Sequence, residues 1–481
     1  MASFETQLFI NNEYVDAKSG EFLTLYNPTD DTLVSDKIHS AGEADIDAAV
    51  AAAKAAFKGP WGKMGPTSRA KILFKFADLV RQKAEDLGKL ESLAMGSAVS
   101  TQTLGSHACA DLLTYYAGWA DKLLGETSYP GEDGKYKISQ REPIGVCSGI
   151  GAWNASYLLF GWKVAPALAA GNTFIYKPSE KSPLGLLALG PLIKEAGFPP
   201  GVINIVNGAG KTGALLASHM EIRQIGFTGS TATGRRIQEA AAKSNLKRVS
   251  LELGGKSPSI IFDDADLETA VTKSAQGVLV NTGQVCAMAS RIFVQEGIAD
   301  QFIGALKGAL EGASASGAIG DPMNKNTMVG PVADKAQFDR VMSYIESGKK
   351  DGQLVTGGTR KGDKGNFIEP TIFKNTPSDA KIVREEVFGP VATVQTFKTE
   401  EEAIEMANDT IFGLSACVFT KNISRALRVT RQIEAGTVAV NDFFFPTVDT
   451  GFGGFKQSGY GREGGPEGIN DYLQFKTIHI K

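Results

Sequence analysis

The residues with the clearest chemical potential are one cysteine and one glutamate. Cys286 follows a polar bend that contains Gly283, just after the apolar run 277–280, so its thiol is predicted to face a pocket. Upstream, Glu252 lies between two leucines at the end of a predicted strand and precedes a glycine pair. A thiolate is a nucleophile, and a partly desolvated carboxylate accepts a proton from water. Together these two side chains predict covalent catalysis.

Each residue alone has a simpler explanation. A cysteine in an apolar setting is more often a small buried hydrophobe, and a lone glutamate is more often solvated or ion-paired. The surrounding motifs favour the catalytic interpretation, because they occur in one order along the chain. The motifs are Gly149-Ile150-Gly151-Ala152-Trp153-Asn154, Lys177-Pro178-Ser179-Glu180, Gly226-Phe227-Thr228-Gly229-Ser230-Thr231, Glu252-Leu253-Gly254-Gly255-Lys256, Gly283-Gln284-Val285-Cys286, Glu385-Glu386-Val387-Phe388-Gly389-Pro390 and Phe452-Gly453-Gly454-Phe455-Lys456. In the wording and order of these motifs the chain resembles the NAD(P)-dependent aldehyde dehydrogenases over essentially its whole length.

The resemblance implies a role for each matching catalytic residue. Cys286 is the nucleophile, Glu252 activates water, and the side-chain amide of Asn154 with the main-chain N–H of Cys286 forms an oxyanion hole. Lys163 and Glu463 match positions that handle protons. From the residues alone, Asn154 is equally well explained as a helix N-cap, and Lys163 and Glu463 as solvated or ion-paired surface groups.

The resemblance also implies a NAD site. The segment with Phe227, Gly229 and Ser230 ends a strand and begins a helix, whose free N–H groups favour a phosphate, although a plain N-cap on Ser230 or Thr231 is the alternative. Lys177 and Glu180 match ribose contacts, and because a carboxylate repels a 2′-phosphate, NAD is favoured over NADP. The other implied cofactor contacts are Ile150, Trp153, Ser179, Gly210, Leu253, Glu386 and Phe388.

The implied reaction oxidises a small-molecule aldehyde to its carboxylic acid through a thioester on Cys286, with hydride passing to NAD. Two departures from the family pattern predict a wider channel for a larger aldehyde. Ala155 and Ser156 replace an aromatic residue and a proline after Asn154, and Val280 stands where an aromatic residue often lines the channel. A betaine-aldehyde dehydrogenase is the alternative, followed by a thiol-dependent esterase and a catalytically silent homologue.

Composition limits the partners. The net charge of −3, from 50 basic and 53 acidic residues, argues against nucleic acid. The 4 cysteines and 4 histidines lack metal-ligand spacing, so no metal is expected. No apolar run approaches the roughly 20 residues that cross a bilayer, so no membrane association is expected. Residues 1–6 lack a signal pattern, and a cytoplasmic location is the expectation.

The elements that must position these residues alternate between short β-branched runs and Ala/Leu-rich stretches, which predicts an α/β fold with parallel sheets. We expect strands at 144–150, 172–176, 202–206, 222–227 and 248–253, and helices at 43–58, 68–92, 157–170, 183–196, 211–219 and 231–243. By resemblance, the chain has the aldehyde dehydrogenase fold and assembles as a homodimer or homotetramer. A Rossmann-like NAD-binding domain is expected at 1–120 and 140–252, an α/β catalytic domain at 253–455, and a β oligomerisation arm at 121–139 and 466–481.

Overall fold

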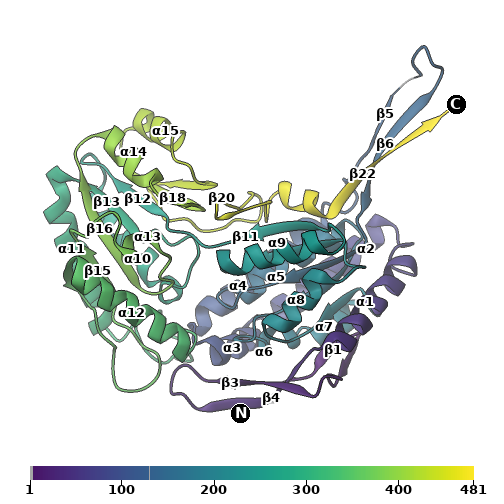
Figure 1. Cartoon of the computed structure of the whole chain (residues 1–481), viewed down its shortest axis with the longest axis horizontal. Helices are drawn as coiled ribbons and strands as arrows, with labels where there is room; N and C mark the ends of the chain where they lie inside the picture. Colours follow the sequence, from purple (N-terminus) through teal and green to yellow (C-terminus); the bar gives the residue numbers. More distant parts are fainter. Residues whose placement is uncertain (1–3, 129) are drawn as a thin grey trace.

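The computed structural model describes residues 4–128 and 130–481. Two α/β halves lie side by side, each built around its own sheet, and a narrow arm projects from one of them (Figure 1). Residues 1–3 of the N-terminal segment and residue 129 of the expected oligomerisation arm lie outside the described residues. The two sheets confirm the predicted α/β class.

The first half is built on an eight-stranded sheet in the order β2-β1-β9-β8-β7-β10-β11-β21. The five neighbouring strands β9, β8, β7, β10 and β11 are parallel. By contrast, β1, β2 and β21 are antiparallel additions at the two edges. Three central strands are buried along their whole length, as expected for a parallel sheet covered on both faces. The strands are β1 Leu8–Ile10, β2 Glu13–Val15, β7 Val146–Ile150, β8 Thr173–Lys177, β9 Ile203–Ile205, β10 Gln224–Thr228, β11 Arg248–Glu252 and β21 Gly459–Tyr460.

Helices cover both faces of this sheet. They are α1 Glu43–Lys58, α2 Pro66–Gln82, α3 Ala84–Met95, α4 Val99–Ala117, α5 Ser156–Ala169, α6 Leu184–Leu187, α7 Gly190–Ala196, α8 Gly210–Ser218 and α9 Thr231–Lys243. The expected helix at 68–92 is wrong as a single element, because the chain bends at Lys83 between α2 and α3. The bend brings α3 onto α4, where Gly88 permits close approach: a methyl group there would lie 2.9 Å from the main-chain nitrogen of Thr103.

The expected helix at 183–196 is also divided, into α6 and α7. Pro191 has no N–H to donate to the carbonyl of Leu187, so the helical hydrogen bond is missing there. The hydroxyl of Tyr14 donates to that carbonyl at 2.6 Å instead. A side chain far away in sequence therefore stabilises the break.

The second half is built on a seven-stranded sheet in the order β14-β15-β16-β13-β12-β18-β19, parallel except for β14. Its strands are β12 Pro258–Ile261, β13 Arg291–Gln295, β14 Gln353–Thr356, β15 Thr371–Lys374, β16 Val391–Phe397, β18 Ser415–Phe419 and β19 Thr437–Val440. Its helices are α10 Leu267–Leu279, α11 Ala299–Ala315, α12 Lys335–Asp351, α13 Lys381–Arg384, α14 Glu400–Asn408 and α15 Ile423–Thr430.

The projecting arm is a three-stranded antiparallel sheet in the order β22-β6-β5 (Figure 1). It contains β5 Glu126–Ser128, β6 Tyr136–Pro143 and β22 Leu473–Ile480, and β6 continues past the boundary expected at residue 139. Two small pairs complete the strands, β3 Glu21–Tyr26 with β4 Leu33–Ser40, and β17 Phe412–Gly413 with β20 Phe455–Lys456. Within residues 4–128 and 130–481, no helix combines the length and apolar character needed to cross a bilayer.

Candidate active site

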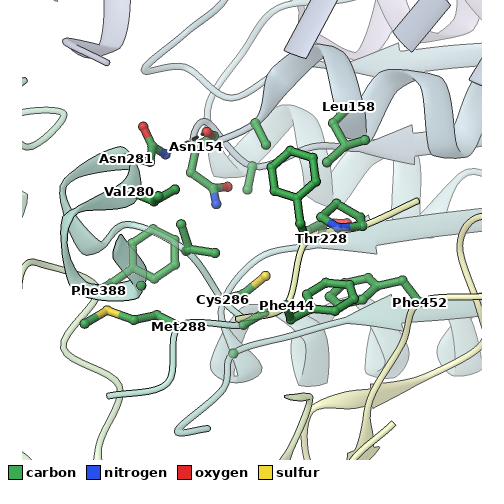
Figure 2. Close-up of a pocket in the computed structure, with 18 of the residues that line it drawn as sticks. Asn154, Leu158, Thr228, Val280, Asn281, Cys286, Met288, Phe388, Phe444 and Phe452 are labelled. Carbon is green, nitrogen blue, oxygen red and sulfur yellow. Dashed lines mark hydrogen bonds between the residues drawn. The ribbon is translucent and has the colours of Figure 1, made fainter. Parts of the chain in front are cut away.

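A cavity of about 350 Å³ is lined by residues from both halves of the molecule. Figure 2 shows Cys286 with Asn154 and Val280 on one side and Phe444 and Phe452 on the other. Of the expected site residues, the cavity wall includes Trp153, Asn154, Gly229, Ser230, Glu252, Leu253, Cys286, Glu386 and Phe388. The remaining expected residues lie outside this wall, and they are Ile150, Lys163, Lys177, Ser179, Glu180, Gly210, Phe227 and Glu463.

A tight loop after α10 carries the cysteine. Asn281, Thr282 and Gly283 have left-handed φ angles of 49°, 59° and 67°. For the β-branched threonine this conformation is strained and requires anchoring. Its hydroxyl donates to the Gly330 carbonyl at 2.9 Å, and Gln284 Nε2 donates to the Asn281 carbonyl at 3.1 Å. The loop is therefore a rigid support for the thiol.

The Cys286 thiol is half-buried in the cavity wall. Burial, followed by the charges of Glu386 and Glu252, raises the pKa of this thiol to about 12. The resting thiol is thus protonated at neutral pH, and its reaction requires a group that accepts the proton. The other cysteines are buried and unbridged: Cys109, Cys147 and Cys417.

The Asn154 side chain is linked directly to the cysteine loop. Its Nδ2 donates to the carbonyl of Gln284 at 3.0 Å, and Asn281 Nδ2 donates to the Asn154 carbonyl at 2.9 Å. The helix N-cap explanation is wrong, because the residue that caps α5 is Ala155 and no side chain caps that end. One N–H of Nδ2 is used by Gln284, which leaves the second for a ligand in the cavity.

Glu252 ends β11 and lines the cavity with a carboxyl group that is almost completely buried. Neither of its oxygens has a hydrogen-bond partner among the described residues. Burial, and then the charge of Glu463, raises the pKa of this carboxyl well above its ordinary value. An unpartnered buried carboxyl is costly unless it acquires a partner such as water or substrate.

Behind Glu252 lies a buried ion pair. Lys163 is fully buried and donates both to Thr228 Oγ1, at 2.5 Å, and to the carboxylate of Glu463. A surface location for Lys163 and Glu463 is therefore wrong, although their ion pairing is real. Thr228 itself lines the cavity, so it connects this pair to the cavity wall.

The junction between β10 and α9 has the features of an anion site. Ser230 caps α9, because its hydroxyl accepts from the Thr233 N–H at 3.3 Å. Gly229 leaves the approach open: a methyl group there would lie 2.6 Å from the ring of Phe227. The free N–H groups of the first turn and the helix dipole favour a phosphate here, so the N-cap and the anion site are compatible.

The expected ribose contacts form a separate group outside the cavity wall. Lys177 Nζ lies 3.6 Å from the Glu180 carboxylate and donates to the Pro178 carbonyl at 2.9 Å. Burial lowers the pKa of Lys177, and the charge of Glu180 opposes that effect. Ser179 is buried beside this pair, and Gly210 begins α8. The side chains of Ile150, Phe227 and Leu253 belong to one buried apolar cluster.

Glu386 and Phe388 belong to the second half of the molecule and line the cavity. Glu386 Oε1 accepts from the Gly255 N–H at 3.1 Å, and burial raises the pKa of Glu386 to about 7. Phe388, with φ of 58°, contacts Trp153 edge-to-face at 5.2 Å between ring centroids. At Gly254 a side chain would overlap the Glu386 carboxylate. The absence of a side chain at Gly254 therefore leaves room for the Glu386 carboxylate.

Two further residues hold the loop 386–388, and neither was expected from the sequence. On α12, Gln337 Nε2 donates to the Phe388 carbonyl at 2.8 Å, and Arg340 donates to the Glu386 carbonyl at 3.1 Å. Both line the cavity, as does Lys273 on α10. No local motif marks these positions, since only tertiary packing brings α12 to the loop.

One side of the cavity is an aromatic wall. The rings of Trp162 and Phe452 are stacked with centroids 5.1 Å apart and planes 14° apart, and Phe444 and Phe452 stack at 5.1 Å and 13°. The residues elsewhere around the cavity include the small Ala155 and Val280.

Within the described part of the chain, no group of three or more His, Cys, Asp or Glu side chains is placed to hold a metal ion.

The chain is similar to known proteins over almost its whole length. The sequence pattern of the aldehyde dehydrogenase family matches residues 14–478. An aldehyde dehydrogenase of Emericella nidulans is 46% identical over 476 residues, which cover 98% of this chain and 95% of the relative. Retinal dehydrogenase 2 of Homo sapiens is 46% identical over 481 residues, covering 99% and 92%. The NAD+ complex of a Bacillus cereus aldehyde dehydrogenase superposes with a TM-score of 0.96 at 41% identity, covering 99% of this chain and 96% of that one.

Proposed function

This chain belongs to the aldehyde dehydrogenase family and is an aldehyde dehydrogenase, and from that premise we propose how its residues carry out the reaction. The observation that supports the proposal is the convergence of three groups on one cavity: the Cys286 thiol, the Asn154 amide and the Glu252 carboxyl. A nucleophile, an oxyanion donor and a base are the parts that oxidation through a thioester requires.

In the first step the Cys286 thiol gives its proton to water, and the resulting thiolate adds to the carbonyl carbon of the aldehyde. The new C–S bond turns the carbonyl oxygen into an oxyanion, which accepts hydrogen bonds from Asn154 Nδ2 and the main-chain N–H of Cys286. A preorganised donor of this kind contributes about 3–4 kcal/mol to transition-state stabilisation. NAD, when bound, would supply the hydride acceptor for this oxidation. Loss of hydride from the adduct carbon leaves a thioester on Cys286.

In the second step Glu252 takes a proton from water, and the resulting hydroxide attacks the thioester carbon. The C–S bond breaks, the carboxylic acid leaves, and the thiolate is restored. The absence of a hydrogen-bond partner on either Glu252 oxygen, among the described residues, supports this role because both oxygens are free to receive water. Lys163 and Glu463 are proposed to pass the proton away from the cavity, since their charges act on the Glu252 carboxyl.

The cofactor is proposed to lie along the ends of β8, β10 and β11. The first turn of α9 would hold the pyrophosphate, Lys177 and Glu180 the adenosine ribose, and Glu386 the nicotinamide ribose. The Glu180 carboxylate is half exposed beside Lys177 and would repel a 2′-phosphate, which favours NAD over NADP.

The substrate channel is proposed to accept a larger aldehyde. Support comes from the contrast between the stacked rings of Trp162, Phe452 and Phe444 and the small side chains of Ala155 and Val280. Such a wall also suits a quaternary ammonium through cation–π attraction, so betaine aldehyde is the second candidate substrate. Ala155 weakens that candidate, because it supplies no ring to an aromatic cage.

The protein is proposed to assemble as a homodimer or homotetramer through the arm. Phe475 and Ile480 are exposed on β22 and Tyr136 on β6, and within the described residues β5 and β22 form the two edges of the arm sheet. Exposed edges and apolar side chains of this kind are usually covered by another chain.

The first sheet is proposed as the core of the NAD-binding domain and the second as the core of the catalytic domain.

The test is NADH formation by the purified protein with aliphatic, aromatic and trimethylammonium aldehydes, alongside Cys286→Ala. We expect turnover that requires Cys286 and favours bulky apolar aldehydes over small ones. Equal turnover by Cys286→Ala would rule out the thioester mechanism. Ester hydrolysis that depends on Cys286, without any NADH formation, would instead identify an esterase.

A further inference from the structure

A second buried carboxyl lies beneath the turn that carries Asn154. Glu91 on α3 is fully buried, and the hydroxyl of Ser156 donates a hydrogen bond to its Oε1. Ser156 Oγ also lies 2.9 Å from Ser182 Oγ, and Ser182 Oγ lies 3.5 Å from the carbonyl of Trp153. These contacts join the carboxyl to both ends of the turn 153–156.

The helix end of this turn lacks a side-chain cap of its own. Ala155 is the cap residue of α5, with φ of −151° and ψ of 53°, and its side chain cannot bond to the free N–H groups of the first turn. The first turn of α5 also lacks an acidic residue of its own. Glu91 supplies a carboxyl at this helix end from another element, and Tyr157 adds a second link by donating to the Leu87 carbonyl at 2.9 Å.

The need to fill the interior does not by itself explain why a glutamate stands at position 91. Burial raises the pKa of its carboxyl to about 8, and its Oε2 has no hydrogen-bond partner among the described residues. The site also requires a glycine opposite, because a methyl group at Gly185 would lie 2.7 Å from that Oε2. An apolar side chain would fill the same volume without the cost of a buried polar group.

We propose that Glu91 is a positioning residue, which holds the turn 153–156 through Ser156 and Ser182 so that Asn154 Nδ2 meets the oxyanion. The cysteine loop fixes Asn154 from one side through Asn281 and Gln284. Glu91 fixes the same turn from the opposite side, where the chain enters α5. This inference rests on the proposed role of Asn154 as an oxyanion donor.

The test compares Glu91→Leu and Ser156→Ala with the native chain and with Glu85→Leu, a matched change at an exposed position of the same helix. We expect each of the first two variants to lower kcat about tenfold, less than the ~10²–10³-fold loss of a whole oxyanion donor. The KM values for aldehyde and NAD should stay within about twofold, because the turn contributes to the transition state rather than to ground-state binding.

A double-mutant cycle separates positioning from general structural support. Glu91→Leu should lower kcat less than about twofold when Asn154 is already alanine, because its effect passes through Asn154. An equal loss in both backgrounds, or a kcat for Glu91→Leu that matches that of Glu85→Leu, would overturn the inference. If Glu91→Leu fails to fold, Ser156→Ala takes its place in the same cycle.

The same experiment distinguishes this inference from the proposed function. A large loss of kcat in Asn154→Ala with no loss in Glu91→Leu or Ser156→Ala overturns the role of Glu91 alone. An unchanged kcat in Asn154→Ala overturns the oxyanion role of Asn154, and the role of Glu91 with it. Thermal unfolding of each variant shows whether a loss of kcat accompanies a loss of folded protein.

Discussion

The main chain at Gly255 runs so close to Cys286 that a methyl group on Gly255 would overlap the carbonyl oxygen of Cys286. The same glycine donates its N–H to Glu386 and lies three residues beyond Glu252. The segment that carries the proposed base therefore passes directly against the backbone of the proposed nucleophile. The two segments can approach this closely because Gly255 has no side chain.

Gly255→Ala should consequently displace the Cys286 loop. We expect kcat/KM to fall by about tenfold or more, since small displacements of reacting groups are costly. Gly304→Ala is the control, because it lies exposed within α11 with no atom near its Cβ position. That control should keep its activity and gain about 0.5–1 kcal/mol in the free energy of unfolding, measured with urea. Unchanged kcat/KM in Gly255→Ala would show that the loop adapts.

Glu252→Gln should separate the two halves of the reaction. The amide cannot take a proton from water, so the thioester should form once and then hydrolyse about 10²–10⁴-fold more slowly. Stopped-flow absorbance should show one burst of NADH per active site, followed by slow turnover. Glu268→Gln, an exposed carboxylate on α10, should behave like the native chain. A native steady-state rate without Glu252 would assign the base to another group.

Activity should rise with pH over the neutral and mildly alkaline range. The reaction requires the deprotonated forms of Cys286 and Glu252, and burial raises the pKa of both groups. Raising the pH from about 6 to about 9 therefore increases the reactive fraction, and the acid limb should dominate the profile of kcat/KM. An optimum below neutrality would contradict this assignment. The profile is measured with a saturating concentration of NAD.

Glu180→Gln should weaken the discrimination between cofactors. Removal of the carboxylate removes its repulsion of a 2′-phosphate, while Lys177 remains to attract one. We expect kcat/KM for NADP to rise about tenfold relative to kcat/KM for NAD, which corresponds to about 1.4 kcal/mol. Glu268→Gln again serves as the control. An unchanged ratio would place the discriminating contact elsewhere.

Val280→Phe should narrow the substrate channel opposite the aromatic wall. A ring at this position would occupy space beside Cys286 (Figure 2), so bulky aldehydes should be affected more than small ones. We expect kcat/KM for a naphthaldehyde to fall about tenfold relative to kcat/KM for propanal. Leu354→Phe, on β14 far along the second sheet, should leave the ratio unchanged. Equal losses for both aldehydes would argue against a channel role for Val280.

Much of the framework was predictable because its signals are local. The strand that ends at Glu252 and the helix capped by Ser230 are encoded by apolar runs and capping residues within a few positions of each other. Such signals fail where a distant group decides the outcome. The break before Pro191 depends partly on Tyr14, and the bend at Lys83 accompanies the packing of α3 on α4.

The sequence by itself determined the class of chemistry, because a thiol in its motif, a glutamate at a strand end and an asparagine at a strand-to-helix junction are recognisable from their neighbours. Only the tertiary structure decided how these groups are supported. Gln337 and Arg340 reach the Glu386 loop from another helix, and Glu91 reaches Ser156 from α3. Hydrogen bonds between residues so far apart in the chain follow from how the sheets and helices pack, and no local pattern encodes them.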